Sequence, residues 1–481
     1  MLDIYSSKRF KKVRNGIGMN AGVNIDQGPV NWQIIQHTDA KADIELSGTF
    51  ALPEGFEEGK VYARVVREDM GISVIGWTAC ETLENDRWKV KLQDVPAGGL
   101  YRIETCLSHA KLGEAIEWAF RGDMIHHIGV GDIYVIAGQS NSAGYGKDPV
   151  YDPPEIGIHI LRNSGKWDLA SHPLNDSTHT VHPENRDRAN PGHSPYLAFS
   201  RLLKKELGYP IGLIQTALCG SGLESWNPGE DGILYRNMLS IVRSQGGKLK
   251  GILWYQGCSD TREPLCDTYL ERFRNMVSCL RVDLEEESLP FLTVQINRKT
   301  TPSDPASDQC WAKVREAQRA AARGIPHVYI VPSLDCTLTD EIHNSSASNM
   351  VLGERIAKTA LAQIYKRNFH CSPPDIISAQ ISNTQTLKLV FGGIKGRMFA
   401  YHVGAKQIPF TVEDTLGQLE IDSYTIENRN EIHLKLNRDI EGKVFVHGAY
   451  GQNPIQPVPI DTETHLPMLA FYGVEAVREN I

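Results

Sequence analysis

The chain has 481 residues, a length that predicts two or three domains rather than one. Its net charge of −8 argues against a general nucleic-acid binder, and no apolar stretch approaches the roughly 20 residues that a membrane span needs. Hydrophobic residues make up 41% and charged residues 22% of the chain, which is typical of a globular protein.

The nine cysteines are scattered, and none forms the Cys-x-x-Cys pair that is typical of a zinc site. We expect most of them to be reduced, small core residues. The N-terminus carries several basic residues without the apolar segment that a secretory signal peptide needs after them. Together these features predict a cytoplasmic protein, although a leader removed from the chain would leave the same sequence.

Short β-like segments at regular spacing occupy residues 35–125. Their apolar residues alternate at period two, and turn residues separate them, which is typical of an antiparallel sandwich. The segments are 44–50, 61–66, 73–77, 88–92 and 100–106. We therefore predict an N-terminal β domain over residues 1–125, of which residues 1–34 fit no clear pattern.

From residue 131 to about residue 370, apolar strands alternate with amphipathic helices. The expected strands are 132–137, 211–216, 251–255, 291–296 and 328–331. A helix over 195–207 follows the first strand, because Ser194 fits its N-cap, Pro195 its first turn and Gly208 the position after its end. Five strand–helix units predict an α/β fold with a five-stranded, doubly wound parallel sheet, the flavodoxin-like arrangement.

Pro373-Pro374 ends this alternating part, and a β pattern returns after it, for example over 387–391. We therefore predict a catalytic domain over residues 126–372 and a C-terminal β-rich domain over 373–481. Within the catalytic domain, the polar segment 147–193 is expected to be a long irregular loop, and loops of that length are usually functional or mobile.

The stretch 131–144 joins a buried strand to a small polar turn. Its apolar residues run directly into Gly138-Gln139-Ser140-Asn141. Ligands and reacting groups in open α/β sheets gather at the carboxyl ends of the strands. The glycines at 138 and 144 allow a tight turn around the serine. We therefore predict that Ser140 is a nucleophile.

A serine nucleophile needs a base, and the base needs a group that orients it. The sequence offers Asp340-Glu-Ile-His343, in which a carboxylate and an imidazole can share one turn. Many surface turns carry such a pair. Here it follows the fifth expected strand and precedes a helical pattern, so we expect His343 at the same sheet edge as Ser140.

Two further loops after strands have the composition of oxyanion-binding loops. Gly220 follows the second expected strand, and a glycine lets a bare backbone N–H approach a developing oxyanion. Gln256 follows the third strand and offers a side-chain N–H donor. For each loop, an ordinary strand-to-helix turn is the alternative interpretation.

Taken together, Gly-Gln-Ser140-Asn, Gly220, Gln256-Gly257 and the Asp-x-x-His pair resemble the SGNH-hydrolase superfamily, and more narrowly its sialate O-acetylesterase-like carbohydrate esterases. Further segments that fit this pattern are 130–133, 210–214, 253–257, 314–318 and 448–454. The resemblance implies a Ser140, Asp340 and His343 triad, with Gly220, Gln256 and the Ser140 N–H as the oxyanion hole. It implies no metal and no other cofactor.

Two positions depart from the family pattern. Many relatives have Gln-Gly-Glu where this chain has Gln256-Gly257-Cys258, and in some of them the glutamate supports the histidine. Cysteine has no carboxylate that could accept the imidazole N–H, so this role is expected to fall to Asp340. Ser142 stands where methionine is common, and a small polar residue there is expected to widen or hydrate the pocket.

The implied function is hydrolysis of O-acetyl groups on carbohydrates by an acyl-enzyme mechanism, with an acetylated carbohydrate as the partner and neither nucleic acid nor membrane. Trp226 is a candidate to stack on a sugar face, with core packing equally open. Gln139 and Asn141 are candidate substrate contacts. Acetylated sialic acid and plant oligosaccharides are both compatible with the sequence, and so is a homo-oligomer.

Two other functions stay open at this point. One is an esterase that acts on short-chain, non-sugar esters, and the polar character of segment 147–193 disfavours a lipase among these. The other is a carbohydrate-binding protein on an inactive esterase fold. The presence of all five site residues argues against that, because an inactive fold does not need them.

Overall fold

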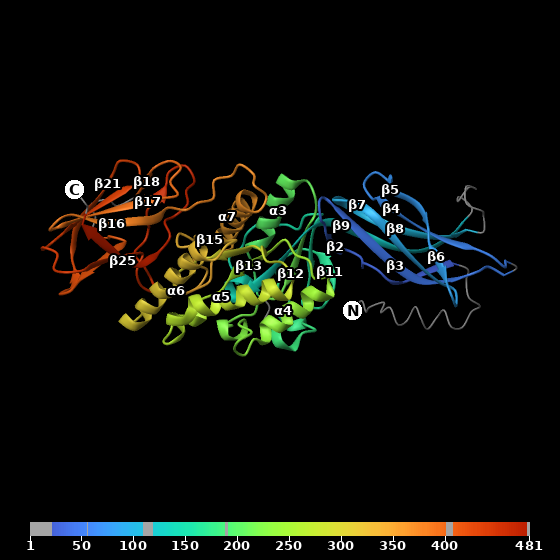
Figure 1. Ribbon diagram of the computed structural model, residues 1–481, viewed down its shortest axis with the longest axis horizontal. Coiled ribbons are helices and arrows are strands. Elements are labelled where there is room, and N and C mark those ends of the chain that lie inside the picture. The colour runs from blue at the N-terminus through green and yellow to red at the C-terminus, as the bar shows by residue number, and fades with distance from the viewer. Residues whose placement is uncertain (1–21, 55, 109–118, 188–190, 401–406, 479–481) are drawn as a thin grey trace. The chain divides into compact units, whose positions relative to one another are not determined.

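The computed structural model describes residues 22–54, 56–108, 119–187, 191–400 and 407–478 (Figure 1). Residues 1–21, which include the segment considered for a signal peptide, lie outside the described residues. The contacts divide the chain within strand β9 (Phe120–Gly138), between Asp132 and Ile133. Among the described helices, none is both long and apolar enough to cross a membrane.

Two sheets form the N-terminal unit. The first contains, in order, β1 (Gly22–Gln27), β3 (Lys41–Ala51), β7 (Arg87–Pro96) and β6 (Glu81–Leu83), with antiparallel pairing. The second contains β5 (Ser73–Ala79), β4 (Lys60–Arg67), β8 (Gly98–Ser108) and β9, also antiparallel, with β2 (Ile34–Gln36) parallel to β9. Alternate residues such as Ile44, Leu46 and Leu92 are buried in one core, which is how the period-two pattern folds into antiparallel β structure.

A mostly parallel sheet lies at the centre of the second unit. Its strands follow the order β10 (Ile158–Leu161), β12 (Ile211–Gln215), β9, β13 (Gly251–Tyr255), β14 (Phe291–Val294) and β15 (Val328–Val331). One row of residues crosses the four parallel neighbours β9, β13, β14 and β15: Ala137, Trp254, Thr293 and Ile330. Their carboxyl ends therefore meet at one edge, where the loops that carry the predicted site residues begin.

All five expected strands are present with ends within a few residues of the prediction, except that β9 begins at Phe120. The expectation of an irregular segment over 147–193 is wrong in part. This segment contributes both β10 and β11 (Trp167–Leu169) to the sheet, in which β11 is the neighbour of β10. These strands are only three or four residues long, and polar residues surround them, so no periodic pattern announces them.

Helices cover both faces of this sheet (Figure 1). Helices α3 (Tyr196–Leu207) and α7 (Ser346–Gln363) lie over one face, and α4 (Ile233–Ser244), α5 (Leu265–Asp283) and α6 (Pro305–Gly324) lie over the other. At Gly353 of α7, an added Cβ would lie 2.1 Å from the Pro195 carbonyl oxygen. Only a glycine therefore allows α3 and α7 to pack so closely.

A disulfide between Cys266 and Cys310 joins helices α5 and α6, and the two Cα atoms are 5.3 Å apart. The expectation of reduced thiols is therefore wrong for this pair. The two residues are 44 positions apart in the sequence, and only the packing of the helices brings them together. The other seven cysteines are unpaired.

The C-terminal part is β-rich, as expected. Its eight-stranded sheet has the order β20 (Gly417–Leu419), β19 (Phe410–Asp414), β23 (Val444–Gly448), β25 (Phe471–Arg478), β16 (Asp375–Asn383), β17 (Thr386–Gly392), β22 (Glu431–Leu436) and β21 (Ile421–Glu427). A short pair, β18 (Met398–Phe399) with β24 (Ile460–Asp461), accompanies it. Phe391, Phe410 and Phe471 contribute to a hydrophobic core within this part. The C-terminal part nevertheless belongs to the same compact unit as the parallel sheet.

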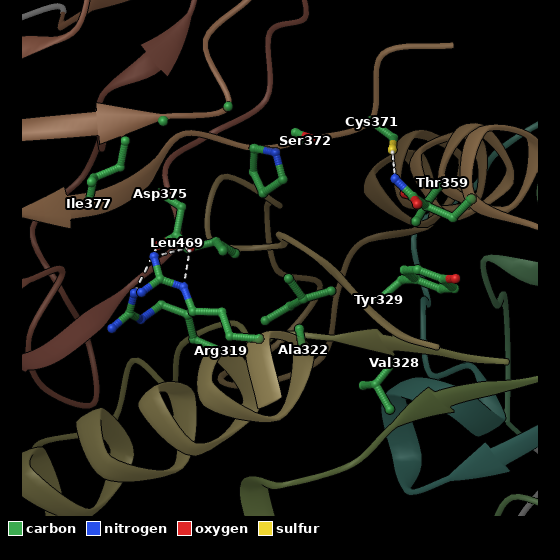
Figure 2. Close-up of a pocket in the computed structure, with 16 residues that line it drawn as sticks. Arg319, Ala322, Val328, Tyr329, Thr359, Cys371, Ser372, Asp375, Ile377 and Leu469 are labelled. Carbon is green, nitrogen blue, oxygen red and sulfur yellow. Dashed lines mark hydrogen bonds and ion pairs between the residues drawn. The ribbon is translucent and has the colours of Figure 1, made fainter. Parts of the chain in front are cut away.

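An ion-pair cluster joins the C-terminal part to helix α6, which packs on the parallel sheet. Arg319 and Arg323 of α6 both bind Asp375 at the start of β16, with N–O distances of 3.0 and 2.7 Å (Figure 2). Beside this cluster lies a cavity of about 350 Å³, lined in part by the apolar Ala322 and Leu469. Because α6 ends just before β15 begins, this junction lies at the amino-terminal edge of the sheet, opposite the Ser140 edge.

Candidate active site

Ser140 lies in a sharp turn between β9 and the short helix α2 (Ser140–Ala143) and is 5% exposed. Gly138, directly before this turn, has a φ of +122°, and an added Cβ would lie 2.4 Å from the Tyr255 carbonyl oxygen. Glycine is therefore required for β9 to approach β13 beneath the serine. The N–H groups of Ser142 and Ala143 both donate to the Gln139 carbonyl at 2.9 Å, which closes the turn that carries the serine.

His343 and Asp340 form the pair that the spacing predicts. The Nδ1 atom of His343 is 2.7 Å from Oδ2 of Asp340, while Oδ1 accepts the N–H groups of Ile342 and His343 at 2.9 and 2.8 Å. Partial burial acts to raise the pKa of Asp340, but the hydrogen bonds from the imidazole and the two N–H groups hold it below its ordinary value. Asp340 is thus an ionised group that orients the imidazole and leaves Nε2 for a proton transfer.

Asn141 joins the turn of Ser140 to the turn of His343. Its Nδ2 donates to the Ile342 carbonyl at 3.2 Å, and its Oδ1 accepts the N–H of Asn344 at 3.0 Å. These partners are the two neighbours of the histidine, and Asn141 itself follows the serine. One buried side chain therefore brings the two loops together. Asn141 does not fit the predicted role of substrate contact, because both ends of its amide are used within the protein.

Two residues beside the pair were missed at the sequence level. The ring of Tyr145 stacks on that of His343, with centroids 4.8 Å apart and planes at 27°, and its hydroxyl donates to Asp187 at 2.9 Å. Burial raises the pKa of the Cys219 thiol, and the neighbouring hydroxyls of Tyr145 and Ser140 act to lower it. Their adjacency to Gly144 and Gly220 was the available signal, but neither side chain is of a type that marks a site.

The two predicted oxyanion loops differ in what they offer. Gly220 has a φ of +70°, and a Cβ added there would meet nothing within 4 Å, so this backbone faces open space. Gln256 is 0% exposed, and its Nε2 donates to Asp260 at 2.5 Å and to the Ser221 carbonyl at 3.2 Å. Both amide hydrogens of Gln256 are thus occupied. The predicted direct contact with an oxyanion would require one of these bonds to break.

Two further predicted substrate contacts are interior residues. Gln139 is 4% exposed, and its Oε1 accepts the Gly257 N–H at 2.9 Å, which joins the turn of Ser140 to the loop after β13. Trp226 is 0% exposed, and its indole N–H donates to Ser221 Oγ at 3.0 Å. The predicted sugar-stacking role of Trp226 is therefore wrong, because the residue has no accessible face. Composition alone cannot tell a buried loop tryptophan from an exposed one.

The structure gives both departures from the family pattern a local explanation. Burial raises the pKa of the Cys258 thiol to about 12, so this residue stays neutral and offers no charge to a histidine. Ser142 is 0% exposed, its Oγ donates to the Ala137 carbonyl at 2.8 Å, and it lies 2.7 Å from the Tyr196 hydroxyl. The expectation that Ser142 widens the pocket is wrong, because its side chain points into the interior.

One group of residues has the donor atoms of a metal site. The Nε2 atoms of His172 and His193 are each 3.0 Å from Oδ2 of Asp152, and Oδ1 accepts Arg201 at 2.6 Å. The two imidazole rings stack at 4.0 Å, both Nε2 atoms share Oδ2 of Asp152, and Arg201 already supplies a positive charge beside this carboxylate. Burial opposes ionisation of Asp152, but its three partners lower its pKa strongly. We interpret this group, called the Asp152 hub below, as a hydrogen-bonded anchor for segment 147–193.

Comparison with known proteins agrees with this geometry. A family model, carbohydrate esterase, sialic acid-specific acetylesterase, matches residues 130–362, a range that contains all the residues described at the site. A protein of Arabidopsis thaliana, named probable carbohydrate esterase, is 31% identical over 260 residues, which are 49% of this chain and 91% of that relative.

A solved structure extends the likeness beyond the catalytic part. A carbohydrate acetylesterase from Xanthomonas citri matches with a TM-score of 0.64 and 18% identity, over 92% of this chain and 97% of the other. At this identity the match shows a shared fold, which includes the β-rich parts because nearly the whole chain is covered. The family match and the Arabidopsis relative show that this chain belongs to the carbohydrate esterase family of the sialic acid-specific acetylesterases.

Proposed function

We propose that this protein is a serine esterase that removes O-acetyl groups from carbohydrates through an acyl-enzyme. The observation that carries the proposal is the Asn141 bridge, which holds the turn of Ser140 against the turn of His343. The Asp340 contact orients the imidazole at that same point. Membership of a carbohydrate esterase family supports the choice of an ester on a sugar.

Acylation begins when Nε2 of His343 takes the proton of the Ser140 hydroxyl as its oxygen attacks the acetyl carbonyl carbon. Asp340 stabilises the imidazolium that forms. The N–H groups of Ser140 and Gly220 hold the oxyanion, and each such donor is worth about 3 kcal/mol. The imidazolium then protonates the sugar oxygen as the C–O bond breaks, which leaves acetyl-Ser140 and a free sugar hydroxyl.

Deacylation repeats these steps with water. His343 takes a proton from water as the water oxygen attacks the acetyl carbon, and the same donors hold the second oxyanion. Ser140 leaves with the proton that the imidazolium returns, and acetate is released. In this scheme Gln256 acts through Asp260, which also accepts the Leu223 N–H at 3.0 Å and so fixes the Gly220 loop.

The test is hydrolysis of 4-nitrophenyl acetate, butyrate and octanoate, followed by acetate release from a panel of acetylated oligosaccharides. We expect turnover of the acetate ester above the longer esters, and acetate release from at least one sugar. Preference for octanoate would support a lipase-like enzyme instead. Folded protein without activity on any ester would contradict the enzymatic function altogether.

A further inference from the structure

A loop of the C-terminal part reaches the active-site edge of the sheet. It follows β23 and contains Gln452, whose main-chain N–H donates to Asp308 at 2.8 Å. The side-chain Nε2 of Gln452 donates to the carbonyls of Thr301 at 2.8 Å and Lys299 at 3.4 Å, and the Lys299 N–H donates back to the Gln452 carbonyl at 3.1 Å. Gln452 is 5% exposed, so water does not compete for these bonds. The loop after β14 is therefore fastened to the C-terminal part.

Arg315 of α6 also binds both of these segments. It is 0% exposed, and its guanidinium donates to the carbonyls of Ile296 and Asn297 on one side. On the other side it donates to the carbonyls of Gly451 and Gln452. Burial lowers the pKa of Arg315 to about 9, which still leaves the group charged at neutral pH. A charged five-donor fork thus clamps two loops through four main-chain carbonyls.

The loop that is held in this way contacts the histidine turn at two points. Asn297 Nδ2 donates to Asn344 Oδ1 at 2.8 Å, and Asn344 directly follows the histidine. The N–H of Thr300 donates to the carbonyl of Glu341 at 2.9 Å, two residues before the histidine. Asn344 also donates its N–H to Asn141. Displacement of the loop after β14 would therefore move both sides of the imidazole.

We propose that Gln452 and Arg315 are positioning residues for His343, so that the C-terminal β-rich part completes the active site. Neither residue touches the reacting atoms, and each acts through the loop after β14. The expected effect of these residues on kcat rests on the proposed esterase function. Its structural core, the coupling of residues 449–453 to the histidine turn, does not depend on that function.

The chain supplies a matched control at the other edge of the sheet. Asp375 joins the same C-terminal part to α6 through Arg319 and Arg323 (Figure 2). That cluster also spans the two parts with charge-assisted hydrogen bonds, but it lies at the amino-terminal edge, away from the loops of the site. If the C-terminal part only stabilises the fold, loss of either junction should have the same kind of effect.

The experiment compares Gln452→Ala with Asp375→Asn in the full chain. We expect Gln452→Ala to lower kcat for 4-nitrophenyl acetate about 10-fold or more with KM within about twofold, because a misplaced base slows the chemical step without weakening binding. We expect Asp375→Asn to leave kcat within about twofold and to lower only the melting temperature. Gln452→Glu, which keeps the size but replaces the donor, should lose kcat as Gln452→Ala does.

Hydrogen exchange provides a readout that needs no activity. In Gln452→Ala, peptides that cover residues 339–345 should lose amide protection, whereas in Asp375→Asn they should match the wild type. Equal protection of this turn in all variants would overturn the inference, and so would an unchanged kcat in Gln452→Ala. Loss of protection in a protein that is inactive towards every ester would support the coupling while the esterase proposal fails.

Discussion

Two Asp-x-x-His turns in the described part of the chain pair a carboxylate with the imidazole three residues later. In Asp340–His343 the carboxylate is 2.7 Å from Nδ1 of the imidazole, and in Asp176–His179 the distance is 2.9 Å. Their surroundings differ. The His179 side chain is 75% exposed, whereas that of His343 is 16% exposed and lies between the Tyr145 ring and the loops of the site.

The comparison shows that the local pair does not make a site. Both turns satisfy the spacing, and in both a carboxylate oxygen lies within hydrogen-bond distance of Nδ1 of the imidazole. Only the later turn follows a strand of the parallel sheet and is joined by Asn141 to a serine turn. A proton acceptor becomes a catalytic base only when a nucleophile is held beside it.

The two turns should differ most when the imidazole of each is removed. His343→Ala should lower kcat/KM about 10⁴-fold, as should Ser140→Ala, because both act in the same transition state. His179→Ala should change kcat/KM by less than about twofold. The measurement is ester hydrolysis at matched concentrations of folded protein, checked by thermal denaturation. Equal losses in the two histidine variants would show that the assignment of the base is wrong.

Removal of the carboxylate should also affect the two turns differently. Asp340→Asn should lower kcat about 10³-fold, because the amide no longer stabilises the imidazolium or fixes its tautomer. Asp176→Asn is its control and should be close to the wild type. If Asp340→Asn keeps near-full activity, another group supports the histidine.

The Asp152 hub should respond in stability and not in turnover. Asp152→Asn removes a buried carboxylate that Arg201 and both imidazoles contact, while Arg201 keeps an ion pair with Glu155 at 3.3 Å, so we expect a loss of about 2 kcal/mol of unfolding free energy. Since the pKa of Asp152 is lowered in the folded state, its stabilisation is present above about pH 4 and is lost as the pH falls towards the folded value.

Denaturant unfolding between about pH 3 and pH 7 measures this effect. The wild type should lose stability more steeply than Asp152→Asn as the medium is acidified. If the unfolding free energies of the two proteins fall in parallel with pH, the ionisation of Asp152 does not contribute to stability. A large loss of kcat per folded molecule in Asp152→Asn would place the hub in the active site.

Asn141→Ala should have a smaller effect than loss of the base. It removes two hydrogen bonds between the loops, and we expect kcat to fall about 30-fold, or about 2 kcal/mol. Asn430→Ala removes a side-chain hydrogen bond of similar length in the C-terminal sheet, the 2.8 Å bond from Asn430 Nδ2 to the Phe391 carbonyl. That control should leave kcat unchanged. A wild-type kcat in Asn141→Ala would show that the Asn141 bridge is not needed for catalysis, and the proposed function would lose its main support.

Much of this arrangement follows from the sequence. The strand that ends at Gly138 and the turn at His343 carry signals that depend on local chemistry: apolar runs, glycines with positive φ and a short Asp–His spacing. The chain order of strands and helices then indicates that these turns share an edge. The four parallel strands β9, β13, β14 and β15 confirm this reasoning.

The missed features depend on burial and on long-range contacts, which a single sequence does not encode locally. Trp226 and Gln256 look like ligand contacts by type and position, yet both are 0% exposed. Tyr145 acquires its place only when residues almost 200 positions later fold against it. The Cys266–Cys310 pairing has the same origin in helix packing.

The assignment of Ser140 as the nucleophile can be tested by trapping the acyl-enzyme. Wild-type protein and Ser140→Ala are mixed with 4-nitrophenyl acetate, quenched rapidly in acid and digested for mass spectrometry. We expect an acetyl group on the peptide that contains Ser140 in the wild type, and none on that peptide in the variant. Acetylation at another residue, or rapid ester hydrolysis by Ser140→Ala, would contradict it.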